Sequence, residues 1–180
     1  MEVFRKLADK HDCWIIEDTC HAPGGYFIDS NSNKQQCGNG NFADLAIFSF
    51  HPVKHIATGE GGMITTNDED LYQKLLMLRT HGITKQSVLF QNTLETALGL
   101  PRIKIDESTT NYYPGWYYEM QELGFNYRIT DFQAALGLSQ LNRADDGLER
   151  RREIAKTYFD AFKNKTFIKG QSDVVEGHAY

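Results

Sequence analysis

The sequence contains no long apolar run. No stretch approaches the roughly 20 consecutive apolar residues that span a bilayer, and residues 1–6 lack the apolar core of a secretory signal peptide. We therefore expect no membrane-spanning segment, no membrane partner and a cytoplasmic location.

Cysteine is also scarce. The three cysteines, Cys13, Cys20 and Cys37, are odd in number and form no Cys-x-x-Cys pair, which argues against a disulfide scaffold and a zinc ribbon. With His11 and His21 they could in principle supply metal ligands, but their spacing matches no closed zinc pattern. We expect reduced thiols and no metal.

An excess of positive charge is missing as well. The chain has 19 Lys and Arg against 24 Asp and Glu, a net charge of −5, which argues against nucleic acid as a partner. The run 150–152 is three arginines, but acids at helical spacing precede it. A solvated helix face is therefore predicted there, with a phosphate-binding patch as the alternative. At 180 residues, 41% of them hydrophobic, the chain can bury a core and form one or two globular domains.

Short apolar runs alternate with helical patterns. Strands are expected at 13–16, 45–48 and 63–66, the first of them buried, and helices over 3–10 and from about residue 67 to Gly82. This order predicts an α/β layer.

The intervening segments are less regular. Turn formers between residues 26 and 40 predict a hairpin, and residues 83–118 form a long excursion with weak periodicity. Thr130-x-x-Gln133 is a capping box that opens a helical stretch through Phe162, which Gly147 could bend.

Polar side chains follow the expected strands. Asp18 ends the first, and Ser49, His51 and Lys54 follow the second. Ligands of open α/β sheets bind beyond the carboxyl ends of the strands, so these four side chains are predicted to share one crevice. A partly desolvated lysine suits Schiff-base chemistry, and a carboxylate suits a protonated pyridine nitrogen. Singly, each is more often a surface lysine or a structural aspartate.

Three motifs in order resemble the DegT/DnrJ family of sugar aminotransferases. They are Ile-Glu-Asp-Thr-Cys-His-Ala at 16–22, Ser-Phe-His-Pro-Val-Lys at 49–54 with Gly-Glu-Gly-Gly at 59–62, and Gly-Phe-Asn-Tyr-Arg-Ile-Thr-Asp at 124–131, followed by Gln-Ala-Ala-Leu-Gly at 133–137. The resemblance implies pyridoxal 5′-phosphate as cofactor. It also implies a PLP-dependent transferase fold of the aspartate aminotransferase-like type I. Residues 1–144 would be part of the large cofactor-binding domain, and 145–180 a linking helix and the start of the small C-terminal domain.

The resemblance also implies roles for individual residues. Lys54 would carry the cofactor as a Schiff base and move a proton during transfer, and Asp18 would pair with the pyridinium nitrogen. His21 would lie near the ring hydroxyl, Ser49 would bind the phosphate, and Asn126 would reach the phosphate bound by the other subunit of a homodimer.

His51 is part of the second motif. It is assigned a supporting role in cofactor binding, and a packed structural histidine is the alternative. The lysine in that motif excludes the dehydratase branch of the family, where a histidine replaces it.

The implied partners are a UDP-linked 4-keto-6-deoxy amino sugar and an amino-acid donor, glutamate. Residues 115–124 most resemble the pseudaminic acid branch of the family. Two other hypotheses remain open: a catalytically silent binding or regulatory relative, and a generic α/β domain in which Asp18 and Lys54 are structural.

Both ends of the chain look truncated against the family pattern. The Gly- and Thr-rich turn that holds the phosphate in family members does not precede Glu17, and residues 177–180 would continue into the small domain. We expect these 180 residues by themselves to bind the cofactor poorly.

Overall fold

The computed structural model describes residues 1–99, 113–170 and 177–180 of the chain. Contacts divide it into two compact units, Met1–Glu69 with Ile129–Tyr180, and Asp70–Arg128. Both sides of the predicted 144/145 boundary contribute to the first unit, and the division into a large and a small domain stays a prediction. None of the helices in the described ranges is long and apolar enough to cross a membrane.

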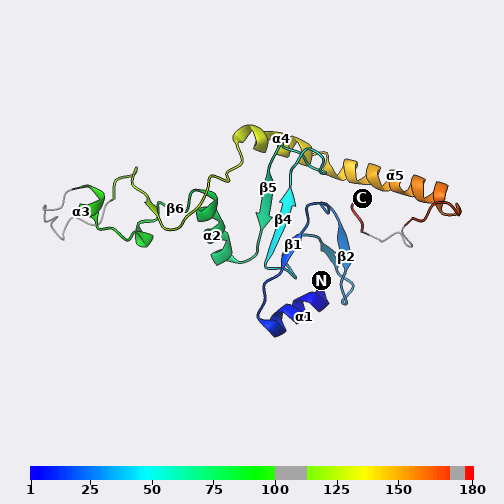
Figure 1. Ribbon diagram of the computed structural model, residues 1–180, viewed down its shortest axis with the longest axis horizontal. Helices are drawn as coiled ribbons and strands as arrows, with labels where there is room; N and C mark the ends of the chain where they lie inside the picture. The colour runs from blue at the N-terminus through cyan, green and yellow to red at the C-terminus, as the bar shows by residue number, and fades with distance from the viewer. Residues whose placement is uncertain (100–112, 171–176) are drawn as a thin grey trace. The chain divides into compact units, whose positions relative to one another are not determined.

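A three-stranded sheet forms the centre of the first unit. Its order is β1 (Ile16–Asp18), β4 (Leu45–Ser49) and β5 (Gly62–Thr65), with β4 in the middle (Figure 1). β1 runs parallel to β4, and β5 runs antiparallel to it, with Ser49 opposite Gly62. The carboxyl ends of β1 and β4 and the start of β5 therefore lie at one edge of the sheet.

The first strand begins later than expected. The helix α1 (Glu2–His11) ends at Asp12, whose backbone is left-handed, and the Cys13 N–H donates to the Ala8 carbonyl at 2.9 Å. The Ile15 N–H then donates to the Asp44 carboxylate at 2.7 Å. Cys13 is thus hydrogen-bonded to the end of α1, and the Ile15 N–H is hydrogen-bonded to a side chain. The predicted strand 13–16 is corrected to 16–18, and Asp18 lies inside it.

The apolar core of the described chain is small. Its buried hydrophobic residues are Ala8, Ala43, Ala46, Ile56 and Ala179. Ile16 in β1 is 60% exposed and Trp14 is 66% exposed, so the prediction that this strand is buried is wrong for the chain as it stands. Its short length and pairing on one side leave its apolar side chains open to solvent.

The predicted hairpin is confirmed. β2 (Tyr26–Ile28) pairs antiparallel with β3 (Lys34–Gln36). Asp29 closes the turn, because its carboxylate accepts the N–H groups of Asn31 at 2.9 Å and Asn33 at 2.8 Å. These bonds, led by the one from Asn33, lower the pKa of Asp29.

Two helices follow the capping box. Thr130 and Gln133 cap each other reciprocally at the start of α4 (Asp131–Leu141), as predicted, and α5 (Ala144–Phe162) comes next. The break lies at residues 142–143, where Arg143 leaves the helical region (φ −118°, ψ 8°). Gly147 lies within α5 and its N–H donates to the Arg143 carbonyl at 3.0 Å. The predicted bend at Gly147 is therefore wrong.

The second unit contains most of α2 (Glu69–Arg79) and the excursion. The described part of the excursion has a strand pair, β6 (Ile83–Thr84) and β7 (Glu119–Met120), with the short helices η1 (Ser87–Leu89) and α3 (Leu94–Ala97) between them. Residues 100–112 of the predicted excursion lie outside the described residues.

The buried carboxylate of Glu119 binds several groups of the segment 83–118. Glu119 is 7% exposed and accepts the N–H groups of Gln91 at 2.7 Å and Asn92 at 3.1 Å, and the Tyr117 hydroxyl at 2.8 Å. Burial raises the pKa of Glu119, but these hydrogen bonds outweigh it and the net pKa is lowered. The excursion is thus built around an ionised side chain.

Candidate active site

Lys54 lies on a closed loop between β4 and β5. The Phe50 N–H donates to the Gly61 carbonyl and the Thr58 N–H donates to the Phe50 carbonyl, both at 2.9 Å, so the two ends of the loop meet. Within the loop the Lys54 N–H donates to the His51 carbonyl at 2.9 Å. Because the antiparallel pairing of β4 and β5 fixes both ends, the lysine is held at the sheet edge.

Asp18 ends β1 at the same edge. Its carboxylate accepts the Cys20 N–H at 3.0 Å. Hydrogen bonds from the Cys20 thiol and then from the Cys20 main chain lower the pKa of Asp18, and the charges of Lys54 and His21 act in the same direction. The interaction with Asp18 raises the pKa of the Cys20 thiol in turn. Asp18 is therefore an ionised carboxylate near neutral pH, within electrostatic reach of the lysine.

A buried turn brings His21 to the lysine. The Thr19 side chain is 1% exposed, and its N–H donates to the Ile47 carbonyl of β4 at 3.0 Å. The Ala22 N–H then donates to the Thr19 carbonyl at 2.9 Å. This turn projects His21 so that its Nε2 contacts the Lys54 Nζ. Residues 33 positions apart in the chain thus meet in one hydrogen bond.

The loop between β4 and β5, residues 50–61, is called the lysine loop below. Ser49 and His51 lie at its start. The half-buried Ser49 Oγ accepts the His51 N–H at 3.4 Å. The His51 Nδ1 accepts the Val53 N–H at 3.4 Å, and its Nε2 lies 3.8 Å from the Glu60 carboxylate across the loop. His51 therefore contacts the loop backbone and a loop acid, and its side chain is 48% exposed.

Asn126 belongs to the second unit. Its side-chain oxygen accepts the Arg128 N–H at 3.3 Å, its backbone bridges Thr80, and the residue is exposed. Five of the six predicted site residues thus lie in the first unit, and Asn126 is placed only within the second.

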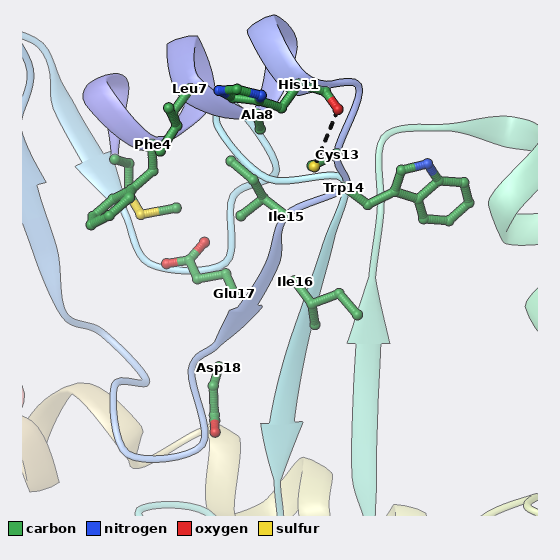
Figure 2. A pocket seen from close by; sticks show the side chains of 11 residues that line it. Phe4, Leu7, Ala8, His11, Cys13, Trp14, Ile15, Ile16, Glu17 and Asp18 are labelled. Atoms are coloured by element: carbon green, nitrogen blue, oxygen red, sulfur yellow. Dashed lines mark hydrogen bonds between the residues drawn. The ribbon is translucent and has the colours of Figure 1, made fainter.

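An apolar groove runs between α1 and β1. It has a volume of about 610 Å³ and is lined by Met1, Phe4, Leu7, Ala8, His11 and residues 13–18. Figure 2 shows Asp18 at the end of this groove farthest from α1, while Ile15 lies beneath the helix. The groove therefore contains Asp18 but no residue of the loop that carries Lys54.

Two contacts of the site were missed by the sequence reasoning. The sequence predicts an ordinary thiol at Cys20, yet the Cys20 N–H donates to the Asp18 carboxylate. The sequence predicts only a capping role for Gln133, yet its Nε2 donates to the Glu60 carbonyl of the lysine loop at 2.8 Å. The suggested cluster of His11, His21 and the cysteines is not assembled: within the described ranges, no group of three or more His, Cys, Asp or Glu is placed to hold a metal.

These features suit a pyridine cofactor that carries a phosphate. An ionised carboxylate ends β1, a lysine amine lies on the loop that follows the adjoining β4, and a serine and a glycine-rich segment lie at the same edge. A lysine amine for a Schiff base, with a carboxylate for the pyridinium nitrogen, indicates the class of PLP-dependent transferases.

Comparison with known proteins identifies one family within this class. The model of the DegT/DnrJ/EryC1/StrS aminotransferase family matches residues 1–179, and the chain belongs to that family. The UDP-4-amino-4,6-dideoxy-N-acetyl-beta-L-altrosamine transaminase of Campylobacter jejuni is 34% identical over 93% of the chain and 36% of the relative. The spore coat polysaccharide biosynthesis protein SpsC of Bacillus subtilis is 35% identical over 91% and 35%.

Solved structures of related proteins agree with this family assignment. Helicobacter pylori PseC, an aminotransferase of pseudaminic acid biosynthesis, matches with a TM-score of 0.67 and 33% identity, over 92% of the chain and 35% of PseC. Spr1654 of Streptococcus pneumoniae, described as a sugar aminotransferase and solved in its PMP form, matches with a TM-score of 0.67 and 27% identity, over 93% and 37%. The expected fold class is confirmed, and pyridoxal phosphate is indicated as the cofactor. The chain spans about a third of the length of these relatives.

Proposed function

We propose that the full-length protein carrying this chain is a PLP-dependent aminotransferase. It transfers an amino group from glutamate to a UDP-linked 4-keto-6-deoxy amino sugar, in the biosynthesis of a surface polysaccharide or flagellar glycan. The observation that carries the proposal is the geometry of one sheet edge: Asp18 ends β1 beside β4, and the loop that follows β4 brings the Lys54 Nζ into contact with His21, three residues after Asp18. A carboxylate for the ring nitrogen and a lysine amine for the aldehyde carbon are the two groups that a PLP site requires.

Lys54 and Asp18 are the proposed catalytic residues. When bound, pyridoxal phosphate withdraws electrons from the carbon that carries the amine of the substrate. The Lys54 Nζ would hold the cofactor covalently and, once displaced by substrate, would accept the proton of that carbon and deliver it to the aldehyde carbon of the cofactor. The Asp18 carboxylate, ionised because its pKa is lowered, would keep the pyridine nitrogen protonated.

The remaining predicted residues would bind and orient the cofactor. His21 contacts the Lys54 amine, and it would donate to the ring hydroxyl. Ser49 would donate its hydroxyl to the phosphate, and His51 would support the lysine loop through its contacts with Val53 and the loop acid.

We also propose that the protein is a homodimer in which Asn126 reaches the cofactor phosphate of the partner subunit. The helix that follows the Asn126 motif, α4, exposes large apolar side chains: Phe132 is 91% exposed, Leu138 64% and Leu141 57%. Large exposed apolar patches are typical of surfaces that another chain covers. This exposure supports an interface at α4.

The choice of sugar is supported by two of the relatives. The Campylobacter jejuni enzyme is named for a UDP-linked dideoxy amino sugar, and PseC is an aminotransferase of pseudaminic acid biosynthesis. The cytoplasm is the proposed compartment, because Cys13, Cys20 and Cys37 are all free thiols, as a reducing compartment maintains.

Reduction with borohydride in the presence of pyridoxal phosphate, followed by mass mapping of peptides, tests the site in the full-length protein. We expect the label on Lys54 and none in the Lys54→Arg variant, which keeps the charge. Amination of a UDP-4-keto-6-deoxy sugar with glutamate as donor then tests the reaction. A label on a different lysine would contradict the site. A label on Lys54 without turnover of any keto sugar would favour a silent binding relative.

A further inference from the structure

The side-chain amide of Gln133 forms hydrogen bonds through both its oxygen and its nitrogen. Its Oε1 accepts the Thr130 N–H at 3.1 Å and the Thr130 hydroxyl at 2.9 Å, which completes the capping box of α4. Its Nε2 donates to the Glu60 carbonyl at 2.8 Å. A single side chain therefore joins the start of α4 to the loop that carries Lys54.

The Glu60 carbonyl is held in place within that loop by a second hydrogen bond. It also accepts the hydroxyl of Thr58 at 2.7 Å, and the Thr58 side chain is 3% exposed. Gly137, one turn further along α4, lets the helix approach closely, since a Cβ at this position would lie 3.0 Å from the Thr58 methyl. The base of the loop is thus held against α4 by one donor and one close contact.

A capping box requires only an acceptor at its third helical position, and glutamate serves there as well as glutamine. The Nε2 donor is therefore surplus to the cap, and it contacts the lysine loop. We propose that Gln133 is a positioning residue: it clamps the loop through the Glu60 carbonyl and so holds Lys54 where the cofactor is bound. The assignment rests on the proposed role of Lys54, whereas the clamp itself does not.

The Gln133→Glu substitution separates the two uses of the amide. Glutamate keeps an oxygen for Thr130, but it replaces the donor with a carboxylate oxygen that faces the Glu60 carbonyl oxygen. Gln140→Glu is the matched control, because it places the same charge in the same helix on another half-buried glutamine. Both variants are made in the full-length protein.

Hydrogen exchange measures the clamp without cofactor. The Thr58 and Phe50 amides, whose hydrogen bonds close the loop, are expected to exchange about tenfold faster in Gln133→Glu, which corresponds to about 1.4 kcal/mol. The first-turn amide of Ala134, which bonds the Thr130 carbonyl, is expected to exchange at the unchanged rate. In Gln140→Glu all three amides should exchange as in the unsubstituted protein.

Titration with pyridoxal phosphate measures the effect on the lysine. The absorption band of the linked cofactor is expected to require about tenfold more cofactor in Gln133→Glu than in Gln140→Glu. Equal exchange of the loop amides in the two variants would overturn the clamp. Faster loop exchange with unchanged cofactor titration would overturn the positioning role. Absence of the band in the unsubstituted protein, with faster loop exchange in Gln133→Glu, would overturn the proposed function and with it the positioning role, but keep the clamp.

Discussion

Glycine-to-alanine substitutions at two helical positions separate the effect of helix propensity from the effect of a tertiary contact. Gly137 lies in α4 and Gly147 in α5. A Cβ built on Gly147 meets nothing within 4 Å among the described residues, whereas a Cβ on Gly137 lies 3.0 Å from the Thr58 methyl. The same substitution, glycine to alanine, therefore has a different outcome at each position.

The magnitudes follow from these contacts. Alanine is more favourable than glycine in a helix interior by about 0.8–1.0 kcal/mol. Gly147→Ala should gain about this amount in the free energy of unfolding. Gly137→Ala gains the same propensity, but Thr58 must move by a few tenths of an ångström, and overpacking of this kind costs roughly 1–3 kcal/mol. The net expected change is a loss of up to about 2 kcal/mol.

Urea unfolding of both variants, followed by circular dichroism, measures the difference. We expect the midpoint to rise in Gly147→Ala and to stay level or fall in Gly137→Ala. Cofactor titration should weaken only in Gly137→Ala, because the displaced Thr58 belongs to the lysine loop. Equal stabilisation by both substitutions would refute the close approach of α4 to this loop.

Four further outcomes are expected. The Glu119→Gln variant should show faster hydrogen exchange at the Gln91 amide, because the neutral amide accepts hydrogen bonds more weakly. In the unsubstituted protein the same protection should persist above the ordinary pKa of a glutamate and be lost as the pH falls through the lowered pKa of Glu119, as NMR would show. Substitution of His51 by Asn should change the free energy of unfolding by less than about 1 kcal/mol, because its pairing with Glu60 is exposed; a larger loss of the denaturation midpoint would give His51 a structural role. The Asp18→Asn variant should bind pyridoxal phosphate at least tenfold more weakly in spectral titrations, since an amide does not hold the ring nitrogen protonated; unchanged binding would exclude Asp18 as its partner.

Local patterns were readable from the sequence because they depend on neighbours in the chain. The capping box at Thr130 needs only residues three positions apart, and the turn at Asp29 needs only the next four. The first strand was shifted by contrast, because its start is decided by Asp44, 29 residues away from Ile15. No local pattern carries that contact.

The sequence by itself predicted which residues carry chemistry, since Asp18, Ser49 and Lys54 follow short apolar runs in motifs typical of the family. Tertiary structure decided how they are held. The contact of His21 with Lys54 and the bond from Gln133 to the lysine loop join residues 33 and 73 positions apart. Such contacts depend on strand register and on how closely a helix approaches a loop, and both are fixed only when the whole unit packs.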